Sequence, residues 1–126
     1  MAIKTVKTLV SQAKAEITTL PRADVQAQVA AGDAILIDIR DIRELDRDGR
    51  IPDALHAPRG MLEFWADPDS PYHHDMFATD KRMILFCAGA WRSALAAKTL
   101  QDMGFDNVAE MEGGYSKWKE DGFPTA

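Results

Sequence analysis

Two short and almost unbroken apolar runs constrain the fold of this chain most strongly. The first is Ala34–Asp38 and the second is Met83–Phe86. A run of this length without polar alternation is typical of a strand that is buried on both faces. Such strands belong to parallel sheets whose two faces are covered by helices. The pair therefore predicts an α/β fold, and Val108–Met111 is expected to form a third strand.

Helix signals fill the segments between these runs. Pro21 begins and Gly32 ends one predicted helix, because proline favours a first turn and glycine a C-terminal end. The alanine-rich segment from Ser93 to Gly104 also has high helix propensity. Further helices are expected over residues 40–47, 60–66 and 115–120. The alternation predicts a mainly parallel central sheet flanked by helices on both faces.

The N-terminal segment has the periodicity of an amphipathic helix. Ile3, Val6, Val10, Ala13 and Ile17 recur at three- and four-residue steps, which places them on one helix face. We expect this helix to pack on the protein rather than on a membrane or a partner. A chain of 126 residues suits one domain. The prediction is a single domain over residues 1–126, with an extra N-terminal helix in 1–16 and the core in 17–124.

Charge and cysteine content exclude several classes of function. The formal net charge of −5 argues against nucleic acid as a partner, because phosphate binding needs a basic surface. Lysines interrupt the N-terminal segment, so we do not expect a secretory signal there, and no apolar run approaches membrane-spanning length. One cysteine permits neither an intramolecular disulfide nor a cysteine-rich zinc site. We therefore expect a cytoplasmic protein without a membrane partner.

The single cysteine, Cys87, directly follows the second apolar run. Ligands of open parallel sheets bind beyond the carboxyl ends of the strands, and Cys87 is expected there. Small residues such as Gly89 let the backbone amides of the next loop curl around an anion. A helix that begins near Ser93 and the charge of Arg92 add positive potential, which favours a reactive thiolate. A buried and inert cysteine is the alternative.

This loop resembles the active-site loop of the rhodanese family, and further segments carry the resemblance. Ile35–Arg40 with Glu44-Leu45 resemble the family's strand and Asp-x-Arg element. Gly49–Ala54 resembles its Gly-His-Ile-Pro-Gly-Ala turn. Phe105–Val108 with Glu112–Trp118 resemble its C-terminal strand and glycine turn. Arg50 and Asp53 stand where the turn pattern has histidine and glycine. Several motifs in the right order make the resemblance specific.

The resemblance implies a ping-pong sulfur transfer that needs no cofactor and no metal. Cys87 takes the outer sulfur of a thiosulfate-like or thiol persulfide donor and passes it to cyanide or a thiol. The resemblance places the donor and the persulfide in a loop of Ala88, Gly89, Ala90, Trp91, Arg92 and Ser93. Asp38 and Arg40 are expected to support the site, mainly by tying a strand end to neighbouring loops. Arg59 is expected either near the pocket or, more simply, on the surface.

The loop also departs from the pattern of many thiosulfate-using members. Ala88 and Gly89 stand where those members carry a basic residue, so Arg92 alone supplies loop charge. We therefore expect thiosulfate to be a poor donor. The bulky Trp91 either shields the persulfide and favours a larger or less charged substrate, or it is a packing residue.

Other functions stay open beside sulfur transfer. Cysteine phosphatases and arsenate reductases space cysteine and arginine by five residues, whereas Arg92 follows Cys87 after four and Ser93 takes the arginine position. A rhodanese-like binding or redox-sensing module is another alternative, because exposed thiolates oxidise readily. His73-His74-Asp75 suggests metal ligands, but adjacent side chains point apart and no metal is expected. The sequence leaves open the oligomeric state and whether residues 58–81 form a lid.

Overall fold

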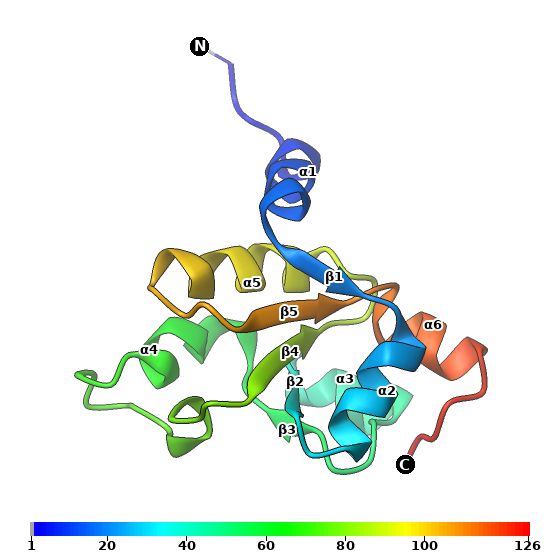
Figure 1. Cartoon of the computed structure of the whole chain (residues 1–126). Helices are drawn as coiled ribbons and strands as arrows, with labels where there is room; N and C mark the ends of the chain where they lie inside the picture. The colour runs from blue at the N-terminus through cyan, green and yellow to red at the C-terminus, as the bar shows by residue number, and fades with distance from the viewer. Residues whose placement is uncertain (1) are drawn as a thin grey trace.

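The computed structural model describes residues 2–126, which form a five-stranded parallel sheet with helices on both faces (Figure 1). The strands are β1 (Thr18–Leu20), β2 (Ala34–Asp38), β3 (Leu55–His56), β4 (Arg82–Phe86) and β5 (Val108–Met111). Their order across the sheet is β1-β5-β4-β2-β3, and each pairing is parallel. The predicted fold class is confirmed. The strand that precedes the cysteine, β4, lies in the middle of the sheet.

The sequence predicts β2, β4 and β5 but misses the two edge strands. Thr18 and Thr19 of β1 are exposed, and so is Leu55 of β3. An edge strand has one neighbour and often faces water, so it does not show the apolar run of a central strand. Both strands are also shorter than the four to eight residues over which strand periodicity is recognised.

Helices cover the two faces of the sheet. They are α1 (Val6–Glu16), α2 (Arg22–Ala30), α3 (Ile42–Asp48), α4 (Leu62–Ala66), α5 (Arg92–Asp102) and α6 (Gly114–Glu120), with 3-10 turns η1 (Arg59–Met61) and η2 (Asp75–Phe77). Apolar residues of α4 and α5 pack on one face of the sheet, and those of α2 and α6 pack on the other. Among residues 2–126, no helix has the length and apolar character needed to cross a membrane.

The predicted N-terminal helix is present as α1, and it lies outside the sheet layers on α5 (Figure 1). Val10 and Ala13 are buried against Ala94 of α5, as the periodicity indicates. The first part of the predicted face differs, because Ile3 precedes the helix and is 84% exposed and Val6 is also exposed. The contact with α5 begins only in the second turn of α1, so the residues before that turn have nothing to pack against.

The middle segment, residues 58–81, packs on the sheet. Its first part forms η1 and α4, close to the helix predicted over residues 60–66. Leu62, Ala66 and Phe77 are buried in the same apolar cluster as Leu85 of β4. The segment therefore contributes a large part of the core on the α5 side of the sheet. This packing gives the segment a structural role.

The turn after α3 explains one departure from the rhodanese pattern. Asp53 has a φ of 66°, which lies in the left-handed region. Glycine adopts this conformation freely, and aspartate is among the few other residues that adopt it at low cost. Asp53 can therefore form the turn in which the family pattern has glycine.

Candidate active site

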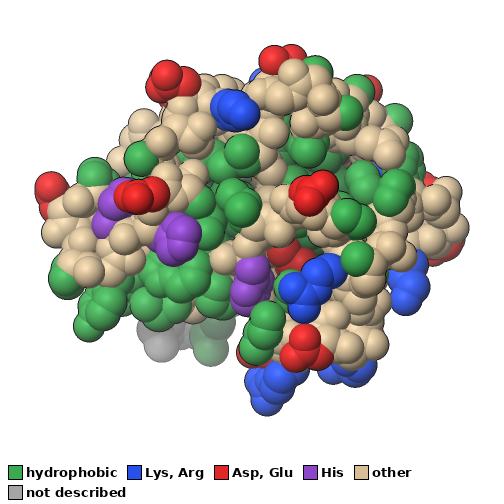
Figure 2. Space-filling model, turned by 90° about the horizontal axis from the view of Figure 1, so that it is seen from below, with side chains coloured by type: hydrophobic (Ala, Val, Ile, Leu, Met, Phe, Trp, Pro, Cys, Tyr) green, Lys and Arg blue, Asp and Glu red, His purple; other side chains and the backbone are tan. Residues whose placement is uncertain are grey.

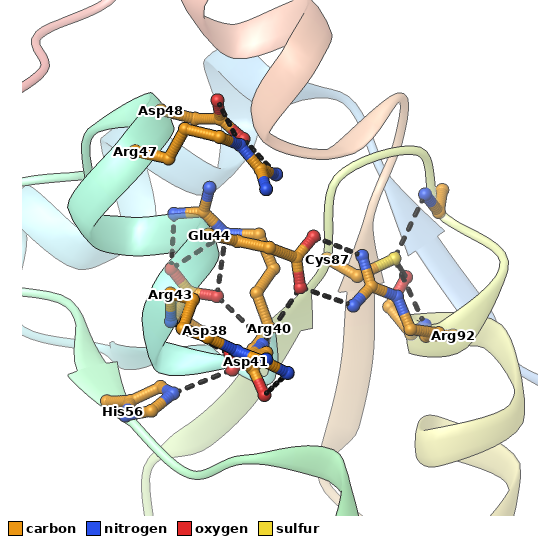
Figure 3. A network of polar contacts seen from close by, with 12 residues as sticks. Asp38, Arg40, Asp41, Arg43, Glu44, Arg47, Asp48, His56, Cys87 and Arg92 are labelled. Carbon is orange, nitrogen blue, oxygen red and sulfur yellow. Dashed lines mark hydrogen bonds and ion pairs between the residues drawn. The ribbon is translucent and has the colours of Figure 1, made fainter.

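Cys87 lies at the carboxyl end of the central strand β4, at the start of the loop that leads into α5 (Figure 3). Its side chain continues the alternation of Met83 and Leu85 and so faces the α5 side of the sheet. Only 1% of the residue is exposed. The position agrees with the expected ligand site beyond the ends of the parallel strands.

Backbone amides of the loop and of α5 point at the sulfur. The amide nitrogen of Ala90 donates to Cys87 Sγ at 3.2 Å, and that of Ser93 donates at 3.4 Å. Ser93 lies in the first turn of α5, where amides have no partner within the helix and the helix dipole is positive. These donors stabilise negative charge on the sulfur and therefore favour the thiolate form of a cysteine at this position.

The left-handed residue of the loop is Ala90 and not Gly89, although both are among the small residues that were expected to let the backbone curl. Ala90 has a φ of 69°, a left-handed conformation that costs a residue with a side chain about 1–2 kcal/mol. The same conformation directs the Ala90 amide at Sγ. Strained residues of this kind are concentrated at functional sites, where the surrounding structure holds them.

The start of α6 holds the other side of the loop. The amide of Tyr115 donates to the carbonyl oxygen of Cys87 at 2.8 Å, and the amide of Ser116 donates to that of Ala88 at 3.1 Å. Gly114 has a φ of 64°, and a Cβ on it would lie 2.6 Å from both carbonyl oxygens. The loop carbonyls thus face α6 while the loop amides face the sulfur. The Gly113-Gly114 pair after β5 is the sequence signal for this contact, although the sequence analysis interprets it only as a turn.

Arg92 is bound by Glu44, which belongs to a segment that resembles the family but was not predicted as a site residue. Its guanidinium donates to both oxygens of Glu44 on α3, at 2.7 and 2.9 Å (Figure 3). The hydrogen bond to Arg92 lowers the pKa of Glu44, and the hydrogen bond to Glu44 raises the pKa of Arg92, with a smaller contribution from nearby Cys87. Arg92 therefore lies beside the cysteine, as expected, but Glu44 balances its charge.

Asp38 and Arg40 form a buried ion pair at the end of β2. Each is 1% exposed, and the Arg40 guanidinium donates to both Asp38 oxygens, the shortest contact being 2.7 Å. Arg40 also donates to the carbonyl of Gly49 at 2.9 Å and lies 4.1 Å from the centre of the Tyr115 ring. The pair joins the end of β2 to α3 and α6. Its side chains have no described contact with the sulfur.

The remaining predicted residues lie around the loop or away from it. Trp91 is 50% exposed at the start of α5, and Gly89 is exposed as well. Arg59 pairs with Glu63 at 2.7 Å and reaches Thr99, two turns along α5 from the cysteine loop. The structure therefore does not bring Arg59 to Cys87.

His73-His74-Asp75 lies in the middle segment. The His74 ring stacks on Trp65 at 5.2 Å, and its Nδ1 accepts from the Met76 amide. Figure 2 shows histidine side chains on this side of the molecule beside exposed hydrophobic ones. Within residues 2–126, no group of three or more His, Cys, Asp or Glu side chains is placed to hold a metal ion. His74 has a packing and capping role in η2.

The chain is thus an α/β domain with a cysteine at the end of a central parallel strand and backbone amides aimed at its sulfur. The sequence matches the model of the rhodanese-like domain over residues 22–121. A sulfurtransferase of Allochromatium vinosum is 29% identical over 92 residues, which cover 73% of this chain and 78% of that protein. Because the matched model spans most of the chain, the chain belongs to the rhodanese-like domain family.

Two solved structures are similar over most of the chain. The polysulfide-sulfur transferase of Wolinella succinogenes is 34% identical with a TM-score of 0.73, covering 95% of this chain and 85% of that one. A protein of Rhodopseudomonas palustris, described as of unknown function and as a possible tyrosine phosphatase, is 46% identical with a TM-score of 0.94, covering 100% and 97%. The relatives of this chain thus include sulfurtransferases.

Proposed function

We propose that the protein is a sulfurtransferase that carries sulfur as a Cys87 persulfide. The observation that carries this proposal is the direction of the Ala90 and Ser93 amides toward Sγ. In the first step the Cys87 thiolate attacks the outer sulfur of a donor R–S–S⁻. The sulfur–sulfur bond of the donor breaks, and its electron pair leaves with R–S⁻. In the second step an acceptor such as cyanide or a thiol takes the outer sulfur and restores the thiolate.

The charge around the loop favours a donor with little negative charge. Arg92 is the only basic residue of the loop, and Glu44 binds it through both carboxylate oxygens. Thiosulfate is a dianion and would gain little attraction from a neutralised arginine. A thiol persulfide R–S–S⁻ carries one negative charge and suits the half-exposed Trp91 of the loop. The similarity to a polysulfide-sulfur transferase supports a sulfane-sulfur donor other than thiosulfate.

The description of the Rhodopseudomonas palustris relative makes phosphatase activity the second candidate. Phosphatase catalysis needs an arginine that clamps the phosphate through two hydrogen bonds. Ser93 takes the position that this arginine would occupy, with five residues between it and the cysteine, and Arg92 is engaged with Glu44. Both features favour sulfur transfer over phosphate hydrolysis.

One experiment separates these activities. The protein is incubated with polysulfide, with a small-molecule persulfide and with thiosulfate, and its intact mass is followed before and after addition of cyanide. We expect a mass gain of one sulfur that cyanide removes as thiocyanate. The Cys87→Ser variant should show neither the gain nor thiocyanate release. No gain with any donor, together with hydrolysis of an aryl phosphate, would establish the phosphatase instead.

A variant that leaves the charge of Arg92 without its carboxylate partner tests the donor preference. Glu44→Gln removes the carboxylate that neutralises Arg92 but keeps a side chain that can complete the capping box of α3. We expect kcat/KM for thiosulfate to rise about threefold to tenfold, because a free guanidinium attracts the dianion, and the gain should shrink at high salt. Kinetics with a persulfide donor should change less. Glu63→Gln, which frees Arg59 on the same side of the sheet, is the matched control and should leave both donors unaffected.

A further inference from the structure

A buried carboxylate lies behind the candidate nucleophile and has no role in the chemistry described above. Glu110 is fully buried on β5, in a strand that is otherwise apolar. It shares the face of Val108 because side chains alternate along a strand, and it therefore faces α5. Burying a charged group is costly unless hydrogen bonds or an opposite charge compensate, so the contacts of Glu110 decide what it does.

Each oxygen of Glu110 has its own partners. Oε1 accepts a hydrogen bond from the hydroxyl of Ser93 at 2.7 Å. Oε2 accepts from Lys14 Nζ at 2.7 Å and from the Thr19 hydroxyl at 2.9 Å. Lys14 belongs to the outer helix α1 and is 37% exposed. A continuous polar chain therefore runs from the surface of α1 through Glu110 and Ser93 to Cys87.

The direction of the hydrogen bonds in this chain follows from the number of protons available. Ser93 has one hydroxyl proton, and it donates that proton to Glu110. Toward the cysteine the hydroxyl then presents only lone pairs, so it accepts the S–H of Cys87 across 3.6 Å. An acceptor at this position favours the thiol, whereas the amides of Ala90 and Ser93 favour the thiolate.

We propose that Glu110 is a positioning residue that sets the protonation of Cys87 through Ser93, and that Lys14 of α1 tunes this effect. The importance of that protonation for sulfur transfer rests on the function proposed above. The hydrogen-bond chain itself does not depend on that function, because the rate of any reaction of the thiolate measures its effect on Cys87. The charged or titratable side chains that face this chain are Arg92 and, through it, Glu44, together with Lys14 and Glu110.

The isosteric variant Glu110→Gln reverses the direction of one hydrogen bond. Lys14 and Thr19 are both donors here, so they require the carbonyl oxygen of the glutamine. Its amide group must then face Ser93 and donate to the hydroxyl oxygen. The Ser93 proton is released and turns toward the sulfur, where it stabilises the thiolate. The loss of a buried negative charge near the sulfur acts in the same direction.

The test is the rate of iodoacetamide alkylation of Cys87 as a function of pH, which needs no sulfur donor. Glu110→Gln should move the pH of half-maximal rate downward, giving roughly tenfold faster alkylation at a pH below the wild-type midpoint. Lys14→Met should move it upward with a smaller effect of about twofold to threefold, because its half-exposed charge is screened. Lys7→Met changes an exposed lysine of the same helix and should leave the profile unchanged.

A double-variant cycle identifies the hydroxyl as the link. In the Ser93→Ala background the Glu110→Gln substitution has no hydroxyl to turn, so its effect should shrink to the charge contribution alone. Circular dichroism confirms that each variant is folded. An unchanged or upward-shifted profile for folded Glu110→Gln overturns the inference, and so does an equal shift with and without the Ser93 hydroxyl. If Glu110→Gln unfolds, an unchanged profile for Lys14→Met overturns it. Absence of a persulfide in the mass experiment would contradict only the proposed function and would leave the inference about Glu110 unaffected.

Discussion

Gly114→Ala is expected to lower the free energy of unfolding by about 2–4 kcal/mol and to stop persulfide formation on Cys87. The new Cβ would lie 2.6 Å from the carbonyl oxygens of Cys87 and Ala88, which are backbone atoms and cannot rotate away. The left-handed φ of 64° adds its own cost for alanine. Either the start of α6 or the cysteine loop must move, and both movements break the amide contacts that orient the loop.

A second glycine provides the matched control for this variant. Gly122 also has a left-handed φ, of 82°, but nothing lies within 4 Å of the position its Cβ would take. Gly122→Ala should therefore cost only the conformational penalty, about 1–2 kcal/mol, and should still form the persulfide. Urea denaturation measures the stabilities and intact mass measures the persulfide. Equal losses in the two variants would contradict the close contact between α6 and the loop.

Asp38→Asn is expected to lower the free energy of unfolding by about 3–5 kcal/mol, although the side chain does not touch the sulfur. The substitution leaves the Arg40 guanidinium, which is 1% exposed, without its counter-charge. An unpaired buried charge costs far more than the net value of the pair that it came from. The total free energy of unfolding of a typical domain is only about 5–15 kcal/mol, so this loss should be visible directly in the urea midpoint.

Two comparisons make the second prediction specific. Asp46→Asn removes one partner of the exposed pair with Arg50 and should change stability by less than about 0.5 kcal/mol. The double variant Asp38→Asn with Arg40→Met removes the stranded charge as well and should recover part of the loss. An Asp38→Asn variant as stable as Asp46→Asn would show that water reaches Arg40 and compensates its charge.

The central strands and the location of the cysteine could be predicted from sequence because each depends on local signals. Buried parallel strands appear as apolar runs, and a cysteine directly after such a run lies at the carboxyl edge of the sheet. The edge strands β1 and β3 carry no comparable signal, since their residues are few and partly exposed. Tertiary pairing with β5 and β2 makes them strands, and a short window of sequence does not contain that information.

The environment of the cysteine was predictable only in part, for a related reason. The amides that donate to Sγ come from the loop and from the first turn of α5, within six residues of Cys87. The carboxylates come from far along the chain: Glu44 lies 48 residues from Arg92, and Glu110 lies 17 residues from Ser93. Glu110 does leave a trace in the sequence, because it is the single charged residue within the apolar run Val108–Met111. A lone charge in a buried strand indicates partners from other elements, but the sequence does not identify them.

The burial of Cys87 also affects whether oxidation can join two copies of the protein through a disulfide. A disulfide between two chains requires sulfur atoms about 2.05 Å apart and Cα atoms within about 7 Å of each other. With Cys87 only 1% exposed and Ala90 4% exposed beside it, two folded copies cannot approach that closely. Oxidative crosslinking of the lone thiol therefore requires the loop to open first. A narrow molecule that ends in a sulfur atom needs much less room, so we expect the burial that hinders a disulfide between two chains to favour small reactants.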